Sequence, residues 1–175
     1  IWSSCSPDFG INGVVDRLGQ IQPKILFCAA AYTYNGKQHD CLAKVHEIQQ
    51  QIKSIEQIVV TPYMDPDPDL SSLKNAALLE DFRHQDASEV EFERLPFNHP
   101  VYILYSSGTT GVPKCITHGA GGTLLQLLKE HILHIDLKRE DRLFYYTTCG
   151  WMMWNWMVNG LATGAAVTVL ITMIA

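Results

Sequence analysis

Short apolar runs alternate with helical patterns along most of this chain. Up to residue 107, apolar runs at 23–30, 55–63 and 101–107 predict strands, and amphipathic stretches at 42–52 and 70–85 predict helices. The alternation continues with a helix near 122–135, a strand near 143–148, a helix near 152–161 and a strand near 166–173. This order predicts an α/β fold with a mostly parallel sheet flanked by helices.

The stretch near residues 122–135 has a clear amphipathic pattern. One stripe at helical spacing carries aliphatic side chains, namely Leu124, Leu127, Leu128, Ile132 and Ile135. Gln126, Lys129 and Glu130 fall on the other side of such a helix. We expect the apolar face to pack against the sheet.

Three histidines raise the question of a metal site. His131 lies on or near the apolar stripe and His134 follows three residues later, so both could bind one metal ion with His118 as a third ligand. Structural histidines are the interpretation that the sequence favours. The carboxylates of Asp65–Asp69 are spaced like a calcium loop but lack the Gly and Glu that an EF-hand needs at positions six and twelve. We therefore predict no metal site.

The C-terminal stretch has no charged residue after Arg142, so it is tested as a membrane span. Polar and turn-forming residues interrupt it, among them Asn155, Asn159 and Gly164. Its last part resembles a buried parallel strand, which is typically a continuous apolar run. We therefore predict that this stretch does not cross a membrane.

Composition narrows the class of protein. The 175 residues are 47% hydrophobic, and no repeat or linker divides them, so we predict one incomplete domain over residues 1–175. The 13 basic residues are scattered and outnumbered by 18 acidic ones, which argues against a nucleic-acid partner. The five cysteines lack C-x-x-C spacing and indicate reduced thiols of a cytoplasmic protein.

A glycine-rich loop, YSSGTTGVPK, spans Tyr105 to Lys114 and follows an apolar strand. The carboxyl end of a strand is where an open parallel sheet binds its ligands. Glycines let the backbone approach a phosphate, while N–H groups, hydroxyls and the lysine supply donors to its oxygens. The loop is not a Walker A motif, because Pro113 stands where that motif needs Gly and Cys115 where it needs Ser or Thr. The complete string favours a phosphate-binding loop over an ordinary surface turn.

The string YSSGTTGVPK resembles the nucleotide-binding signature of the adenylate-forming superfamily, which includes acyl-CoA synthetases, peptide synthetase adenylation domains and luciferases. The resemblance is narrowed to the branch of acyl-CoA synthetases that activates acetoacetate by the flanking strings IWSSCSPDFG, LPFNHPVYILYSSGTTGVPKCITH, GAGGTLLQLLKEHILH and YTTCGWMMWNWMVNGLATGAA. It covers nearly the whole chain. The resemblance implies part of the large N-terminal domain of an adenylate-forming enzyme.

This resemblance also implies a reaction in two steps. A carboxylate, here acetoacetate or a similar short-chain acid, attacks the α-phosphate of ATP, which carries Mg²⁺, and the acyl-adenylate then passes to the thiol of CoA. The implied nucleotide-binding residues are Ser106, Ser107, Gly108, Thr109, Thr110, Gly111 and Lys114. The implied candidates for the acyl pocket are Trp151, Met152 and Met153. Ordinary burial remains an equal alternative for the WMMWNWM segment.

Later motifs of the superfamily bind magnesium and the ribose and close the site with a C-terminal lid domain, and they are not found within residues 1–175. Without them, the loop would lose most of the positioning that makes bound reactants react. We therefore expect a segment of an acetoacetate-activating ligase of lipid metabolism that is inactive by itself. The alternative is a non-catalytic isoform that at most binds nucleotide or has an interaction role.

Overall fold

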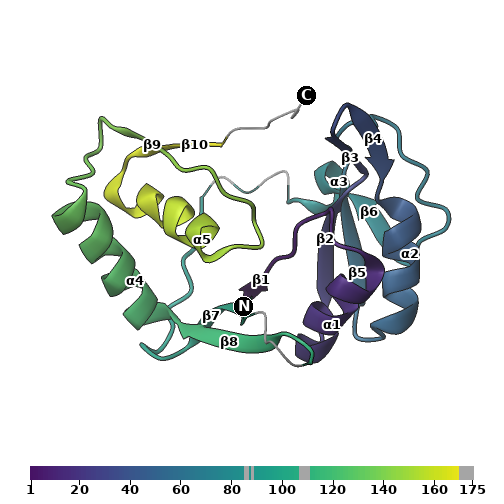
Figure 1. The fold of residues 1–175 in the computed structure, drawn as a ribbon, viewed down its shortest axis with the longest axis horizontal. Helices are drawn as coiled ribbons and strands as arrows, with labels where there is room; N and C mark the ends of the chain where they lie inside the picture. Colours follow the sequence, from purple (N-terminus) through teal and green to yellow (C-terminus); the bar gives the residue numbers. More distant parts are fainter. Residues whose placement is uncertain (85–86, 88, 107–110, 170–175) are drawn as a thin grey trace. The chain divides into compact units, whose positions relative to one another are not determined.

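The computed structural model describes residues 1–84, 87, 89–106 and 111–169. The chain forms two compact units, coloured along the sequence in Figure 1. Among the described residues, one unit contains Ile1–Ser6 and the chain from Glu93 onward, and the other contains Pro7–Phe92. Each unit combines helices with strands, so the predicted α/β class is confirmed. The single incomplete domain stays a prediction.

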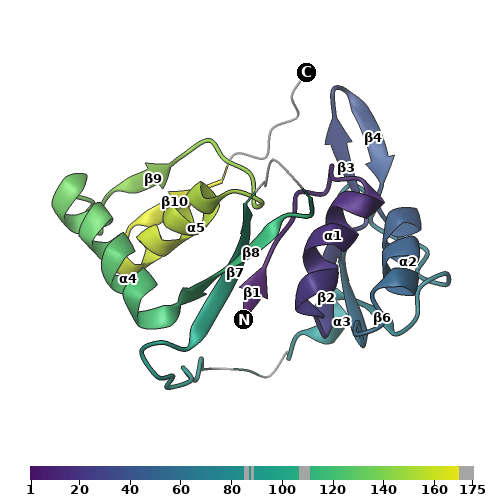
Figure 2. The same ribbon diagram turned by 60° about the horizontal axis from the view of Figure 1, so that its bottom comes forward.

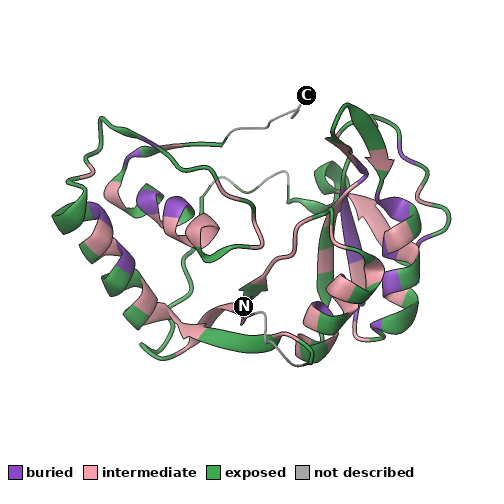
Figure 3. Ribbon diagram, in the orientation of Figure 1, coloured by how far each residue is buried: buried purple, intermediate pink, exposed green. Residues whose placement is uncertain are grey.

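The unit of residues 7–92 is built on a parallel sheet. Its strands lie in the order β2 (Ile25–Ala29), β5 (Gln57–Thr61) and β6 (Ala76–Leu78). Figures 1 and 2 show α1 (Ile11–Ile21) and α2 (Leu42–Gln51) side by side along this sheet, while α3 (Leu79–Phe82) follows β6. Ile58, Val59 and Val60 are fully buried although successive side chains point to opposite faces. Both faces of β5 are therefore covered, and the core of this unit lies around it (Figure 3).

A small hairpin extends from the same unit. Strands β3 (Ala31–Tyr34) and β4 (Lys37–Asp40) pair antiparallel through the two-residue turn Asn35-Gly36. Both turn residues have positive φ, +49° and +68°. This is the conformation that the favoured hairpin turn needs and that Asn-Gly adopts readily.

The other unit begins with a sheet in the order β1 (Trp2–Ser3), β7 (Pro100–Ser106) and β8 (Lys114–Gly119). β1 is parallel to β7, and β8 is antiparallel to it. The chain continues through α4 (Ala120–Lys129), the π-helix η1 (Glu130–His134), β9 (Arg142–Phe144), α5 (Met152–Asn159), the 3-10 helix η2 (Gly160–Thr163) and β10 (Ala166–Thr168). β10 pairs parallel with β9.

The expectation of one continuous sheet is corrected in part. Strand pairs are parallel between β1 and β7, β2 and β5, β5 and β6, and β9 and β10, but they belong to separate small sheets. The elements predicted from the sequence do not include α1, the β3–β4 hairpin or β8. β8 is largely exposed and is held by its pairing with β7, so its apolar pattern is weak.

The helix predicted for residues 70–85 is wrong over most of its length. Asn75 has a left-handed φ of +51°, and its backbone carbonyl accepts the N–H of Ile58 at 3.0 Å. The chain then enters β6, and only α3 is helical. A left-handed residue ends helical geometry, and pairing with β5 takes over.

The apolar stripe predicted near 122–135 is also only partly correct. Leu127 is buried, but Leu124, Ile132 and Ile135 are exposed. The helix changes to a π-turn at η1, where the N–H of Ile135 bonds to the carbonyl of Glu130 at 3.2 Å. His131 lies four residues after the buried Leu127 and is buried on the same face, whereas the wider turn shifts the register of the residues that follow. No helix within the described residues has the length and apolarity needed to cross a membrane.

Candidate functional site

The β7–β8 hairpin frames the predicted phosphate-binding loop. In its register Ser106 lies opposite Lys114, so the two predicted residues stand at the mouth of the loop. Directly opposed residues of an antiparallel pair point to the same face. Lys114 is exposed, which leaves its ammonium group accessible to a ligand. Ser107, Gly108, Thr109 and Thr110 lie outside the described residues.

Gly111 closes the described part of the loop in a conformation suited to glycine. Its φ is +104°, and a Cβ at this position would meet no atom of the described residues within 4 Å. Glycine is therefore needed here for backbone conformation rather than for lack of space.

The first residues of the chain connect β7 to the turn before α5. The Ser3 hydroxyl bonds to the backbone oxygen of Ile103 at 2.8 Å and to the hydroxyl of Tyr105 at 2.9 Å. The Ser4 hydroxyl donates to the backbone oxygen of Cys149. Sequence reasoning assigned no role to these serines, since adjacent serines form no recognisable pattern. The structure shows that they join the strand that leads into the loop to the turn that leads into α5.

The candidate acyl-pocket residues lie at the start of α5. Trp151 precedes the helix in an extended conformation, and its N–H bonds to the carbonyl of Thr148 at 3.1 Å. Trp151 is 70% exposed, Met152 is 49% exposed, and Met153 is partly exposed. Ordinary burial therefore does not account for Trp151 and Met152, whereas it does account for Met157. Their contact with an acyl group stays a prediction.

His131 fixes the other end of α5. Its ring is fully buried, lies 4.5 Å from the Trp156 ring between centroids, and its Nε2 donates to the Trp156 carbonyl at 2.8 Å. This carbonyl belongs to the last turn of α5, where helices leave acceptors without internal partners. The His118 ring lies tilted against the Tyr102 ring, with 4.8 Å between centroids, and His134 is exposed. The structural interpretation of His131 is confirmed.

The described part of the chain contains no group of three His, Cys, Asp or Glu side chains placed to hold a metal ion. Asp65 and Asp69, from the stretch spaced like a calcium loop, accept the N–H groups of Asp67 and Ser71 at 3.3 and 2.9 Å. The Ser71 bonds hold the pKa of Asp69 below its usual value. Both carboxylates are thus occupied by local turns.

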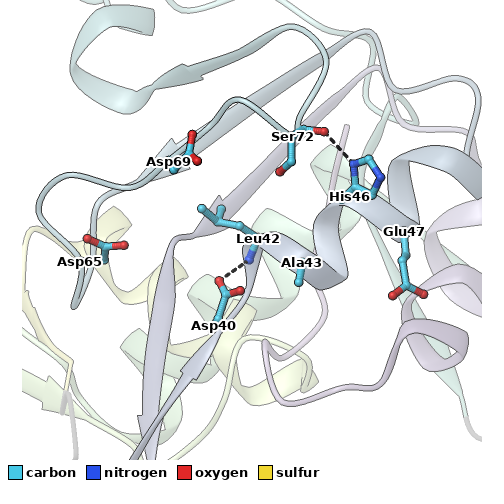
Figure 4. A pocket seen from close by; sticks show the side chains of 8 residues that line it. All are labelled: Asp40, Leu42, Ala43, His46, Glu47, Asp65, Asp69 and Ser72. Atoms are coloured by element: carbon cyan, nitrogen blue, oxygen red, sulfur yellow. Dashed lines mark hydrogen bonds between the residues drawn. The ribbon is translucent and has the colours of Figure 1, made fainter.

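A pocket of about 550 Å³ lies in the unit of residues 7–92, away from the residues predicted to bind nucleotide. Figure 4 shows its lining side chains, which are Asp40, Leu42, Ala43, His46, Glu47, Asp65, Asp69 and Ser72. The Asp40 carboxylate accepts the N–H of Leu42 at 2.9 Å, and His46 Nδ1 donates to the Ser72 carbonyl at 2.7 Å. Asp40 thus bonds to the first residue of α2, and His46 bonds α2 to the loop that contains Ser72.

Comparison with known proteins identifies the family. The family model of the AMP-binding enzymes matches residues 1–173. The chain is 53% identical over 174 residues to acetoacetyl-CoA synthetase from Danio rerio, covering 95% of this chain and 26% of the relative. It is 46% identical over 177 residues to malonamoyl-CoA synthetase from Penicillium aethiopicum, covering 95% and 24%.

The solved structure of acetoacetyl-CoA synthetase from Streptomyces lividans matches with a TM-score of 0.85 at 40% identity, covering 95% of this chain and 25% of that one. The chain thus spans about a quarter of the length of these relatives. With the family model matched over almost every residue and the fold shared with a member, the chain belongs to the AMP-binding enzyme family.

Proposed function

We propose that the protein that carries this chain is an ATP-dependent acid–thiol ligase, which activates acetoacetate as an acyl-adenylate and transfers the acyl group to CoA. The observation that carries the proposal is the glycine loop held by paired strands, with Ser106 opposite Lys114 at its mouth. Similarity to acetoacetyl-CoA synthetases supports the choice of acid. Such an activity belongs to lipid metabolism, and we propose a cytoplasmic location because the five cysteines are far apart and lack C-x-x-C spacing.

In the first step, the acid's carboxylate attacks the α-phosphorus of ATP, and negative charge builds up on the departing pyrophosphate. We assign the backbone N–H groups and hydroxyls of residues 106–111 to its oxygens. Lys114 adds a charged donor, and hydrogen bonds to charged groups contribute about 1.5–3 kcal/mol. Donors held in place beforehand stabilise charge where it develops. Mg²⁺ would arrive on the ATP phosphates and supply further positive charge.

We place the acyl group against Trp151, Met152 and Met153, whose side chains are accessible at the start of α5. The acyl groups in the relatives' names, acetoacetyl and malonamoyl, share a carbonyl at the third carbon and differ in a methyl or an amino group beyond it. Thioether and indole side chains suit the methyl group. An amide left without a partner on such a surface costs about 1–3 kcal/mol. We therefore expect a preference for acetoacetate.

Exchange of pyrophosphate into ATP, measured on the protein that carries this chain, tests the proposal. We expect exchange to require an acid and kcat/KM to be about tenfold or more higher with acetoacetate than with malonamate, since 1.4 kcal/mol corresponds to tenfold. Butyrate, which lacks the third-carbon carbonyl, serves as the matched acid. Absence of acid-dependent exchange with all three would rule out the ligase and favour a non-catalytic role.

Residues 1–175 expressed alone provide a second test. We expect no thioester from them, because a phosphate loop without ribose contacts and a closing domain cannot hold the reactants in position. Formation of acetoacetyl-CoA by this chain alone would contradict that expectation.

A further inference from the structure

Two cysteines far apart in the sequence lie together at the turn before α5. The Cys149 thiol donates to the backbone oxygen of Cys5, with 3.3 Å between Sγ and O. In the reverse direction, the Ser4 hydroxyl donates to the backbone oxygen of Cys149. The two segments are therefore held side by side by a reciprocal pair of bonds, both partly buried.

This geometry brings the two residues within reach of a disulfide. A carbonyl oxygen lies about 2.4 Å from the Cα of its own residue, by standard bond lengths. The Cα of Cys5 is then no more than about 6 Å from the Cys149 sulfur, and the two Cα atoms are no more than about 8.5 Å apart, because a cysteine sulfur lies about 2.8 Å from its own Cα. Disulfides join residues with Cα atoms roughly 4.4–6.8 Å apart. Rotation of the two side chains, with a backbone shift of up to about 2 Å in the partly exposed segment that contains Cys5, would bring the sulfurs together.

The two thiols also differ from the other cysteines in their surroundings. Cys5 and Cys149 are both partly exposed, so a small oxidant can reach them. Cys41 is buried, and burial raises the pKa of Cys28 to about 12, which keeps that sulfur in its unreactive thiol form. Cys115 is exposed on β8, so its oxidation provides an internal control that depends only on exposure to the oxidant.

We propose that Cys5 and Cys149 form an oxidation site, at which a peroxide converts the two thiols into a disulfide. One sulfur, as thiolate, attacks a peroxide oxygen; the O–O bond breaks, leaving a sulfenic acid and, after proton uptake, water. The second thiol attacks the sulfenic sulfur, the S–S bond forms, and a second water leaves. Two thiols lose two electrons and two protons, and one hydrogen peroxide becomes two waters. The cross-link joins the segment after β1 to the turn that carries Trp151.

Peptide mapping of the oxidised protein tests this site directly. Cleavage after Lys and Arg places each of the five cysteines on its own peptide, with Cys5 before Arg17 and Cys149 after Arg142. The protein that carries this chain is treated with hydrogen peroxide, its remaining thiols are alkylated, and it is digested without reductant. We expect alkylation to be lost from both peptides together, in favour of a joined peptide lighter by two hydrogen atoms that dithiothreitol separates again.

Matched variants identify the pair. Cys149→Ser keeps a hydrogen-bond donor but should abolish the joined peptide and restore alkylation of Cys5, whereas Cys115→Ser should leave the joined peptide unchanged. The proposal is overturned if Cys5 and Cys149 stay alkylated, or become separate sulfinic acids, at peroxide levels that oxidise Cys115. Mapping requires no ligase activity, so its outcome is independent of the proposed function.

Discussion

Strand pairing fixes the position of Lys114, while the side chain stays exposed. It is the first residue of β8 and lies opposite Ser106, the last residue of β7. A lysine on a mobile segment would hold a phosphate poorly. The backbone of Lys114 is instead fixed by the hydrogen bonds between β7 and β8. The lysine side chain supplies the positive charge, and the register of β7 and β8 places that charge beside the loop.

Replacing this lysine should therefore weaken nucleotide binding specifically. For Lys114→Met we expect a loss of about 1.5–3 kcal/mol, or roughly 10- to 100-fold in ATP affinity, because the charged donor is lost and the aliphatic chain is kept. Equilibrium dialysis with ATP measures the change. Lys129→Met, at the end of α4 and paired with Glu130, removes the same charge away from the loop and should have little effect. Equal losses in both variants would point to net charge rather than to a phosphate contact.

At Gly160, in contrast to Gly111, the small size of glycine is required. A Cβ there would lie 2.6 Å from Cδ2 of the buried Leu143 and 3.5 Å from Cδ2 of Leu137. We expect Gly160→Ala to lower the free energy of unfolding by about 1–3 kcal/mol through overpacking. Gly122→Ala in α4, where a Cβ would meet nothing within 4 Å, should instead raise it by roughly 0.5–1 kcal/mol. Urea unfolding of both variants tests the pair, and a stabilised Gly160→Ala would contradict the packing.

At the scale of elements, the sequence predicts those that are set by local pattern. The predictions of α2 and β5 are close, because helical spacing and a run of apolar β-branched residues are both local patterns of the sequence. β6 and β8 were not, since one depends on pairing with β5 after the left-handed Asn75 and the other on pairing with β7. The β3–β4 turn was available in principle, as Asn35-Gly36 is a strong hairpin signal.

The candidate site divides in the same way. The loop could be recognised from its residue types, whereas the contacts of Ser3 and Ser4 join positions at opposite ends of the chain. Contacts between such distant positions cannot be predicted from a pattern of neighbouring residues. The burial of His131 agrees with its place on the predicted apolar stripe, whereas the π-turn after α4, which leaves Ile132 and Ile135 exposed, has no counterpart in the sequence pattern.

The contact between η1 and α5 makes His131 a test of element packing. For His131→Ala we expect a loss of about 2–4 kcal/mol in unfolding free energy, because a buried ring and its bond to the Trp156 carbonyl are both removed. His134→Ala, an exposed position in the same π-turn, should change it by less than about 0.5 kcal/mol. Urea unfolding followed by tryptophan fluorescence measures both. Similar small effects would show that the π-turn contributes little to holding α5.

At the scale of the whole molecule, the two units have separate cores and different chromophores. All four tryptophans, Trp2, Trp151, Trp154 and Trp156, belong to the unit that contains β7 and α5. The unit of residues 7–92 contains Cys28 and Cys41, whose pKa values are both raised, chiefly by burial. Tryptophan fluorescence therefore reports one unit, while far-ultraviolet circular dichroism reports both.

Alkaline pH should consequently destabilise one unit more than the other. Cys28 has a folded pKa of about 12 against an ordinary 9.0, so above pH 9 the unfolded chain releases a proton that the folded chain retains. The stabilisation is complete below pH 9. Between pH 9 and pH 12 the free energy of unfolding falls by about 1.4 kcal/mol for each increase of one in pH. Between pH 8 and 10, we expect the urea midpoint to fall in the part of the dichroism transition that fluorescence does not follow. Cys28→Val, which cannot ionise, should reduce this fall. A common shift in both signals, unchanged in the variant, would contradict both the thiol's role and the independence of the units.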